Sequence, residues 1–540
     1  MYKEFFNDDY TFNIPQNFNF TFHVLDKLAE KFPHKKCLVW TDDNGDEKFF
    51  DFLQMKSNVD RTVNYLAVNG IKKGDSVMLI LRRRYEFWFF LLALIKLGAV
   101  AVPCPYTLRS LDLEYRIRCC SPKMIVTFES EELQNEVQSA VNNSTGSIDV
   151  NPLLVTVGSS RKNWKSYWEE ISNLPFAPGI KIPDCSVNDC NDPMLVYFTS
   201  GTSGNPKMVC HDFKYPLIHI ITAKFWQHVC HDGIHLTVAE TGWAKAMWGK
   251  IFGQWLCGSA VFVYDFKSFN PSRLMNKIQQ YGVSTLCATP TIYRYLVQLD
   301  LKSFDLSRLK YAVTAGESIP WNVAVDFYNQ TGLKIREAYG QTETGLLIGN
   351  FGNIENNKPT IGTPNPAYKI MLIDNDGNEI LKPHTIGEIC VDVNYCSVGI
   401  FKGYYKNQEL TEKVFSGGIY HTGDLAYFDE ENNWVYVSRK DDIIKSKGFR
   451  ISPYEVESIL NCHPAVSDSF VFGQKDERKG VVVKCRIVLK ENYEPSDKVA
   501  DDIIKFALSK TSAYKIPQKI EFVNEIQKTL SGKTVRNQHK

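Results

Sequence analysis

The sequence lacks the features that would place it in several specialised classes. Its 14 cysteines are scattered without a repeated C-x-x-C pair, and Met1–Pro15 lacks the basic start of a signal peptide, so we expect reduced thiols and no secretion. Lys and Arg number 62 against 61 Asp and Glu, a balance that argues against general binding to nucleic acid or membrane surfaces. The longest apolar run, Phe87–Ile95, is too short to span a bilayer. These absences predict a cytoplasmic protein with no nucleic-acid partner and no integral membrane segment.

One tract collects side chains that often bind metals. It contains His228, Cys230, His231 and His235. Their spacing matches no zinc motif, so we expect no metal site in this tract.

The length and composition predict more than one domain. At 540 residues the chain is too long for one ordinary domain. Hydrophobic residues make up 44% of it and aromatic residues 13%, enough for large cores. The charged run Arg439–Asp442 marks a domain boundary. We expect an N-terminal domain over residues 1–440 and a C-terminal domain over residues 441–540.

Strand-like and helix-like segments alternate along much of the N-terminal domain. The pattern predicts strands at 77–81, 100–104, 124–128, 194–198, 283–287 and 309–314, and helices at 85–97, 111–119, 274–281, 290–297 and 323–328. Such alternation is typical of parallel sheet covered by helices. Residues 129–190 are polar and weakly patterned, which predicts a surface region anchored by Trp164 and Trp168.

The pattern changes after Pro366. Two antiparallel hairpins are predicted, from segments 368–373 and 389–393 and from segments 425–427 and 434–437. The C-terminal domain is predicted to contain helices at 453–461 and 500–508 and strands at 469–472, 481–489 and 520–523. The expected fold class is therefore α/β: a large N-terminal domain of parallel-rich sheets flanked by helices with a small β subdomain, plus a small mobile α+β C-terminal domain.

The segment Tyr197–Lys207 combines hydroxyl residues, glycines and a lysine directly after an apolar strand. Gly201 and Gly204 allow backbone N–H groups to converge, and Lys207 adds a positive charge, so the segment suits a polyphosphate. It is not the common P-loop, because no Gly-Lys-Ser/Thr follows. A solvated Ser/Gly linker is the alternative, and the adjoining buried strand and the closing lysine argue against it.

Other polar residues follow predicted strands, where ligand sites of open α/β sheets lie. Glu343 would be repelled by a triphosphate unless Mg²⁺ lay between them, so it is the expected metal ligand. Asp424 follows a glycine and is placed to accept both hydroxyls of a ribose, although most such aspartates are turn residues. Arg439 would reach the same nucleotide. The turn Gly316–Ser318 and the ring of Tyr339 would frame an adenine.

Five segments resemble, in the correct order, the motifs of the adenylate-forming enzymes. This superfamily comprises acyl-CoA synthetases, luciferases and peptide-synthetase adenylation domains. The segments are Tyr197–Lys207, Gly340–Thr344, Tyr420–Asp424, Ser438–Arg450 and Leu530–Lys533. Three further stretches make the chain most similar to the medium-chain acyl-CoA synthetases, namely Thr241–Trp243, Thr314–Ser318 and Phe198.

The resemblance implies a ligase that joins a small carboxylic acid to coenzyme A. The acid would attack the α-phosphorus of ATP in the presence of Mg²⁺, and the thiol of coenzyme A would then displace AMP from the acyl-adenylate. The residues implied to bind ATP are Thr199, Ser200, Gly201, Thr202, Ser203, Gly204, Lys207, Gly316, Glu317, Ser318, Glu337, Ala338, Tyr339, Gly340, Gln341, Thr342, Asp424, Arg439 and Lys533. The implied catalytic residues are Lys207, Thr342, Glu343 and Lys533.

The C-terminal domain is implied to serve both half-reactions. Lys533 would bond the carboxylate and the α-phosphate during adenylation, although a lysine this near the chain end is ordinarily solvated. Gly448 would line the tunnel for pantetheine in the second step, so the domain should rotate about Asp441 between the two. The residues implied to bind coenzyme A are Lys447, Gly448, Phe449, Arg450, Lys479, Tyr514 and Lys515. A solvated basic surface is the alternative for the charged members of this set.

Gly340 indicates what size of acid the predicted pocket accepts. Acetate-specific relatives carry a tryptophan at this position, which walls off the acyl pocket. A glycine predicts a deeper pocket, with Trp243 lining or closing its far wall. Because one methylene changes binding by only ~1–3 kcal/mol, several neighbouring acids should react. We expect short-to-medium-chain or branched fatty acids, with aromatic acids such as benzoate as the alternative.

Two other functions stay open on the sequence. One is an adenylate-forming enzyme with an acceptor other than coenzyme A, such as a peptide-synthetase module or a luciferase-like oxygenase. The other is a nucleotide-binding regulator that has lost catalysis. A regulator would show damaged catalytic positions, whereas Glu343, Asp424, Arg439 and Lys533 are all present. The sequence does not decide the oligomeric state, for which a homodimer is the alternative to a monomer.

Overall fold

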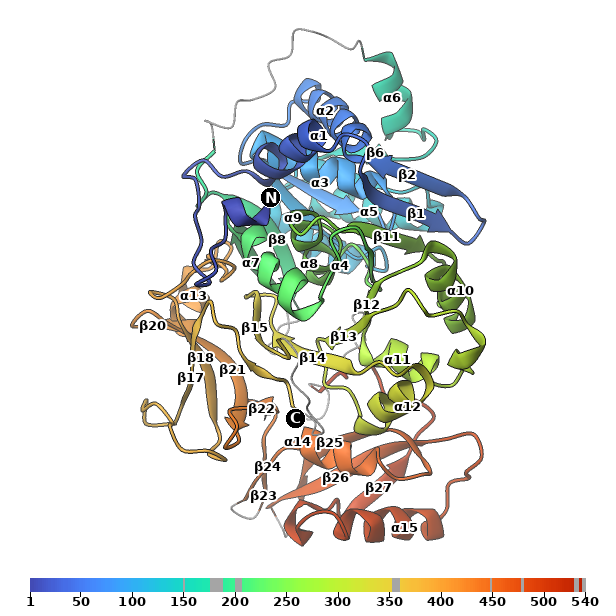
Figure 1. Cartoon of the computed structure of the whole chain (residues 1–540), viewed down its shortest axis with the longest axis vertical. Helices are drawn as coiled ribbons and strands as arrows, with labels where there is room; N and C mark the ends of the chain where they lie inside the picture. The colour runs from blue at the N-terminus through green and yellow to red at the C-terminus, as the bar shows by residue number, and fades with distance from the viewer. Residues whose placement is uncertain are drawn as a thin grey trace.

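The computed structural model describes residues 1–148, 151–174, 188–199, 206–351, 360–446, 449–476, 480–528 and 534–536 (Figure 1). Some residues with predicted roles lie outside these ranges, as does the side chain of Arg450; they are Ser200, Gly201, Thr202, Ser203, Gly204, Lys447, Gly448, Lys479 and Lys533.

Two largely parallel sheets frame the N-terminal part of the molecule. One contains β3 (Ser76–Ile80), β4 (Val100–Pro103), β5 (Met124–Thr127), β6 (Leu153–Thr156), β7 (Lys165–Ser166), β8 (Pro193–Thr199), β9 (Lys207–Asp212) and β19 (Gly403–Tyr404). The other contains β1 (Lys36–Asp42), β2 (Glu47–Asp51), β10 (Ile234–Thr237), β11 (Ala260–Asp265), β12 (Thr285–Cys287), β13 (Tyr311–Ala315), β14 (Ile335–Gly340), β15 (Leu346–Gly349) and β16 (Thr363–Pro364). Within the described ranges the strand orders are β19-β9-β8-β4-β3-β5-β6-β7 and β16-β15-β14-β13-β12-β10-β11-β1-β2.

Helices pack on both sheets. They are α1 (Lys27–Lys31), α2 (Phe52–Val68), α3 (Glu86–Leu97), α4 (Ser110–Cys120), α5 (Glu131–Ser144), α6 (Tyr167–Asn173), α7 (Tyr215–Ile221), α8 (Ala244–Lys250), α9 (Phe252–Leu256), α10 (Pro271–Tyr281), α11 (Pro290–Leu296), α12 (Trp321–Thr331) and α13 (Gln408–Val414). Every residue of α3 is buried, and its core cluster includes Leu79 of one sheet and Val261 of the other. The helix therefore lies between the two sheets, as expected for a segment that is apolar all round.

The region 129–190 differs from the sequence-based prediction. Instead of a weakly patterned surface it contains α5, β6, β7 and α6, and β6 extends the sheet parallel to β5. Leu133, Val137 and Ala140 recur at helical spacing and bury one side of α5. The polar residues between them mask this stripe in the sequence. Trp164 is buried and Trp168 donates a hydrogen bond to Glu86, so these two residues do anchor the region.

The remaining strands form smaller sheets. The β subdomain contains β17 (Lys369–Ile373), β18 (Gly387–Asp392), β20 (Phe415–Ser416), β21 (Ile419–Phe428) and β22 (Trp434–Arg439), all paired antiparallel. The C-terminal part contains β23 (Ile444–Ser446), β24 (Phe449–Ile451), α14 (Pro453–Leu460), β25 (Val466–Asp476), β26 (Gly480–Leu489), α15 (Asp497–Leu508) and β27 (Lys519–Phe522), and it has its own core. It lies beneath α11 and α12 in Figure 1. The expected fold class is confirmed.

No described helix has the length and apolar character needed to cross a membrane.

A buried ion cluster fixes α3 to its neighbours. Lys96 Nζ lies 2.7 Å from Asp26 Oδ2 and 2.7 Å from Asp60 Oδ1, and its side chain is 2% exposed. Lys96→Ala would remove the buried cation between Asp26 and Asp60 and leave both carboxylates beside Lys56, whose side chain is 33% exposed. Because loss of one partner from a buried ion pair is strongly destabilising, we expect the free energy of unfolding to fall by about 3–5 kcal/mol.

Thermal unfolding followed by circular dichroism would measure this loss. The matched control is Lys413→Ala, which removes a lysine whose pair with Glu409 is solvent-exposed, and it should change the midpoint little. Equal midpoints for the two variants would contradict the structural role assigned to Lys96.

Candidate active site

Three separated segments meet at the carboxylate of Asp424. Its Oδ2 accepts hydrogen bonds from the Tyr339 hydroxyl (2.6 Å) and from Gln341 Nε2 (2.6 Å). Its Oδ1 accepts one from the Tyr436 hydroxyl (3.2 Å) and lies 3.6 Å from Arg439 Nε. The register of β21 against β22 places Asp424 directly opposite Arg439. The sequence-predicted pair is thus assembled by ordinary antiparallel pairing.

Gln341 is held in one orientation. Its Nε2 also donates to the Thr422 carbonyl (2.8 Å), and its Oε1 accepts from the Tyr420 hydroxyl (2.7 Å). Tyr420 is buried, and burial raises its pKa well above the usual value, with the charges of Glu343 and Asp424 adding to the effect. It therefore stays a hydrogen-bond donor at any working pH. The turn that begins at Gln341 is consequently fixed relative to Asp424.

Glu343 and Lys207 come together around one aromatic ring. The Tyr404 hydroxyl donates to Glu343 Oε1 (3.0 Å), and Lys207 Nζ lies 5.1 Å from the centre of the Tyr404 ring. Tyr404 reaches this place because β19 pairs with β9, which begins at Lys207. Within the described ranges, Glu343 Oε2 has no recorded partner, so this carboxylate fits the predicted role of a Mg²⁺ ligand.

His211 contacts the turn that begins at Gln341 through a hydrogen bond to Thr342. It is fully buried, and burial lowers its pKa to about 4, so the ring is neutral at physiological pH. Its Nε2 lies 2.7 Å from the Thr342 carbonyl oxygen, to which a neutral imidazole donates. Tyr215 stacks on the other side, with the ring centres 3.9 Å apart. The sequence analysis missed His211 and Tyr404, because each acts through a contact more than 60 residues away in the chain.

The predicted adenine loop is supported by Glu337. Gly316 has φ +103°, a conformation that favours glycine, and it is exposed. Glu337 accepts a hydrogen bond from the Ile319 N–H (3.2 Å), and burial raises its pKa to about 7. Glu317 and Ser318 are half-buried beside it, and Ala338 is buried. The Glu337 carboxylate thus braces the turn, and its predicted contact with ATP stays a prediction.

An apolar cluster lies at the ends of β12, β13 and β14. Its buried members are Trp226, Cys287, Val313, Ala315, Ala338 and Leu346, with Trp248 and Phe351 packed against them. Trp243 is the N-cap of α8, the helix that carries Trp248. Gly340 ends β14 and is exposed, and a Cβ built there would lie 2.7 Å from the Gly345 carbonyl oxygen.

Comparison with known families decides the affiliation. The model of the AMP-binding enzymes matches residues 25–405, and the model of the AMP-binding enzyme C-terminal domain matches residues 455–533. The chain belongs to the AMP-binding enzymes. The resemblance found in the sequence is confirmed, including the likeness to medium-chain acyl-CoA synthetases.

This AMP-binding enzyme has relatives over nearly its whole length. It is 33% identical over 545 residues to the human mitochondrial acyl-coenzyme A synthetase ACSM3, covering 99% of this chain and 91% of the relative. It is 36% identical over 505 residues to 4-hydroxybutyrate–CoA ligase 1 of Metallosphaera sedula, covering 93% and 86%. Among solved structures, the anthranilate CoA ligase AuaEII in complex with anthranoyl-AMP matches with a TM-score of 0.85 and 25% identity, covering 96% of each chain.

The C-terminal part of this AMP-binding enzyme gathers some of the predicted coenzyme A residues. The exposed rings of Phe449 and Tyr514 stack with their centres 4.2 Å apart and an angle of 18° between their planes. Lys515 forms an ion pair with Glu455. Asp441, the predicted hinge, is exposed and lies two residues beyond the end of β22.

Described residues also lie on both sides of the two stretches of the predicted site that fall outside the described ranges. Thr199 and Lys207 pair across β8 and β9, on either side of residues 200–205. Lys528 and Thr534 form a bridge across the stretch that contains Lys533. Arg536 lies 2.6 Å from Glu457 of α14, so residues on both sides of Lys533 are tied to the C-terminal core.

The role of His211 is testable without knowledge of the acid. His211→Ala would leave the partly buried Thr342 carbonyl without its donor and loosen the turn that carries Glu343. Because an acceptor left unsatisfied away from water costs about 1–3 kcal/mol, we expect Mg²⁺–ATP to bind about 5- to 150-fold more weakly. An equilibrium titration with a fluorescent ATP analogue would measure the change.

The control for this variant is His34→Ala, because the His34 side chain is 82% exposed. It should bind as the unaltered protein does. Unchanged affinity in a correctly folded His211→Ala variant would show that the hydrogen bond to Thr342 does not position the turn.

Proposed function

We propose that this protein is an ATP-dependent carboxylic acid–CoA ligase that forms acyl-CoA through an acyl-adenylate. The observation that carries the proposal is the convergence of Asp424 and Arg439 with Glu343 and Lys207 on one turn. That arrangement offers a ribose site beside a polyphosphate site. The 33% identity to ACSM3 and the 36% identity to the Metallosphaera ligase, both named for joining acids to coenzyme A, support the reaction class.

In the first half-reaction, a carboxylate oxygen of the acid attacks the α-phosphorus of ATP, and the bond to pyrophosphate breaks. Positioning and charge neutralisation supply most of the catalysis in such a step. Lys207 would bring a positive charge to the phosphates, and Glu343 would hold Mg²⁺, which would supply further positive charge to the leaving pyrophosphate. The resemblance assigns Lys533 to the carboxylate and the α-phosphate.

The ribose site uses the two oxygens of Asp424 differently. Oδ2 already accepts two short hydrogen bonds, from Tyr339 and Gln341, which fix the carboxylate. Oδ1 has only longer contacts, with Tyr436 and Arg439. Ribose hydroxyls therefore have an acceptor at Oδ1, and their binding would draw Arg439 towards the nucleotide.

In the second half-reaction, the thiol of coenzyme A attacks the acyl carbon, a thioester bond forms and AMP leaves. We infer that residues 1–440 and 441–540 form the two domains and that the second rotates about Asp441. The family models support this division, since one ends at residue 405 and the other begins at residue 455. The stacked Phe449 and Tyr514 offer an exposed aromatic surface to the adenine of coenzyme A.

The acid is proposed to lie against the apolar cluster beside Gly340, which pairs with its member Leu346. Because Gly340 has no side chain, we propose that an acid longer than acetate fits here; Trp248 of α8 packs against the same cluster, and Trp243 caps that helix. We propose short-to-medium-chain or branched fatty acids. An aromatic acid is the second candidate, favoured by the likeness to the anthranilate CoA ligase.

Two further elements belong to the proposal. The cytoplasm is proposed as the compartment to test against the mitochondrion, where the related synthetases are named as acting. A homodimer is proposed as the oligomeric state to test. Cell fractionation and analytical ultracentrifugation decide these points separately from the reaction.

The reaction is tested by release of AMP and pyrophosphate from Mg²⁺–ATP with a panel of acids, with and without coenzyme A. The panel contains acetate, butyrate, 4-hydroxybutyrate, isobutyrate, hexanoate, decanoate and benzoate. We expect steady turnover that requires coenzyme A and is larger for butyrate, isobutyrate or hexanoate than for acetate.

The other outcomes of this assay separate the alternatives. A maximum with benzoate would favour the aromatic acid ligase. Equal AMP release without coenzyme A would indicate a different acceptor. No turnover with any acid, together with intact ATP binding, would replace the ligase by a nucleotide-binding regulator.

The hinge is tested by Asp441→Pro. Proline fixes φ and therefore restricts the backbone rotation that moves the domain. We expect acyl-adenylate formation to stay near that of the unaltered protein, while thioester formation falls by about tenfold or more. Asp441→Ala, which keeps the backbone free, is the control. Equal losses in both half-reactions would refute the hinge assignment.

A further inference from the structure

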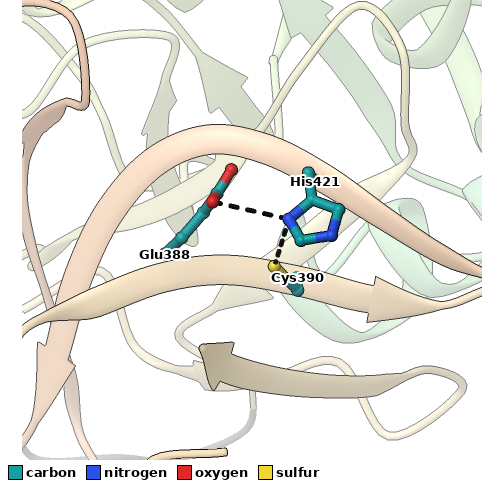
Figure 2. Close-up of side chains that lie close together, drawn as sticks. All are labelled: Glu388, Cys390 and His421. Atoms are coloured by element: carbon teal, nitrogen blue, oxygen red, sulfur yellow. Dashed lines mark hydrogen bonds and ion pairs between the residues drawn. The ribbon is translucent and has the colours of Figure 1, made fainter. Parts of the chain in front are cut away.

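A carboxylate, a thiol and an imidazole share one face of the β subdomain, outside the site described above. Glu388 and Cys390 lie two residues apart on β18, and His421 of β21 is the cross-strand partner of Cys390. Side chains two residues apart on a strand point to the same face, and cross-strand partners are neighbours there. Figure 2 shows the three side chains turned towards one another.

The distances within this group suit a tetrahedral metal ion. Cys390 Sγ lies 3.4 Å from His421 Nδ1, which lies 3.4 Å from Glu388 Oε2. All three atoms lie within 4.8 Å of one another. Zinc bonds of about 2.0–2.3 Å at tetrahedral angles require neighbouring ligand atoms about 3.3–3.6 Å apart. A small movement of one side chain therefore completes the geometry.

We propose that Glu388, Cys390 and His421 form a binding site for a divalent cation of the Zn²⁺ class. On binding, the Cys390 thiol gives its proton to solvent and its sulfur bonds the metal, His421 contributes Nδ1 and Glu388 contributes Oε2. A water molecule takes the fourth position. Sulfur and nitrogen ligands select zinc-like ions over Mg²⁺, so this site is distinct from the Mg²⁺ ligand Glu343.

Lys440 now pairs with Glu388 at the point where the metal would bind. Its Nζ lies 3.0 Å from Glu388 Oε2, and its side chain is 51% exposed, so it can move into solvent. The other oxygen, Glu388 Oε1, accepts a hydrogen bond from the Gly423 N–H (3.0 Å) and keeps the carboxylate oriented. The His421 side chain, 31% exposed, gives the ion a route in from solvent.

The site is connected to both parts of the proposed mechanism. Gly423 precedes Asp424, and Lys440 precedes Asp441. The Lys440 N–H also donates to the Gly423 carbonyl (2.8 Å), so the two segments are tied together beside Glu388. A metal ion here would displace the Lys440 ammonium from Glu388. It would also link β18 to β21 by bonding side chains of both strands.

Cobalt(II) tests the proposal, because a thiolate ligand gives it a charge-transfer absorption band. The reduced full-length protein is titrated with Co²⁺ in excess Mg²⁺, which occupies oxygen-rich sites. We expect one Co²⁺ per chain with this band, and displacement of Co²⁺ by Zn²⁺. Cys390→Ser should abolish the band, and His421→Ala should weaken binding by more than the roughly 10- to 100-fold that loss of an outer-shell partner costs.

The matched control is Cys462→Ser, which removes an exposed thiol from the C-terminal part. It should leave the band unchanged. A band that survives Cys390→Ser, or disappears in Cys462→Ser, would place the metal elsewhere and overturn the proposal.

A gain-of-binding variant covers the case in which Cys390→Ser does not fold. Lys440→Gln removes the competing ammonium without touching a ligand. We expect it to tighten Co²⁺ binding by up to about fivefold, the equivalent of a partly exposed ion pair. Unchanged or weaker binding would show that the metal does not bind at Glu388.

Discussion

The structure of the site depends on a single buried carboxylate. Asp424 joins β14 of a large sheet to the β21–β22 hairpin, because its two oxygens serve Tyr339 and Gln341 on one side and Tyr436 and Arg439 on the other. A buried carboxylate is stable only when its oxygens are satisfied. The same requirement that holds the β subdomain against the sheet therefore also sets the place and direction of the proposed ribose acceptor.

Aromatic hydroxyl groups form the layer around this carboxylate. Tyr420 is buried and Tyr339 and Tyr436 are partly buried, and their removal from solvent raises the pKa of each hydroxyl well above the usual value. They remain neutral donors whether or not a nucleotide is bound. The Tyr404 hydroxyl likewise donates a hydrogen bond to Glu343 and orients its carboxylate. The charges that face the substrates are thus oriented by groups that do not themselves titrate near neutral pH.

Local patterns in the sequence predicted most of the frame, and they also singled out the charged residues of the candidate site, whose roles stay predictions. The strands before the predicted phosphate loop and before Gly316 were found close to their predicted places, because their apolar runs and turn residues are local signals. His211 and Tyr404 were missed, since their roles arise from pairing between segments distant in the chain. Helix α5 was missed because polar residues interrupt its apolar stripe. Contacts such as those of His211 and Tyr404, between segments distant in the chain, leave no periodic pattern in the sequence.

Gly340 constrains how the acid preference of the proposed ligase can change during evolution. Its missing side chain leaves room in the proposed acyl pocket, yet a Cβ built at this position would lie 2.7 Å from the Gly345 carbonyl oxygen. Backbone atoms cannot yield as the end of a flexible side chain can. A lineage that narrows this pocket by a large residue at 340 must therefore also reshape the turn up to Gly345, which carries Gln341 and Glu343. A change in the acids that the proposed pocket accepts would in this way also move residues proposed to bind the nucleotide and its metal.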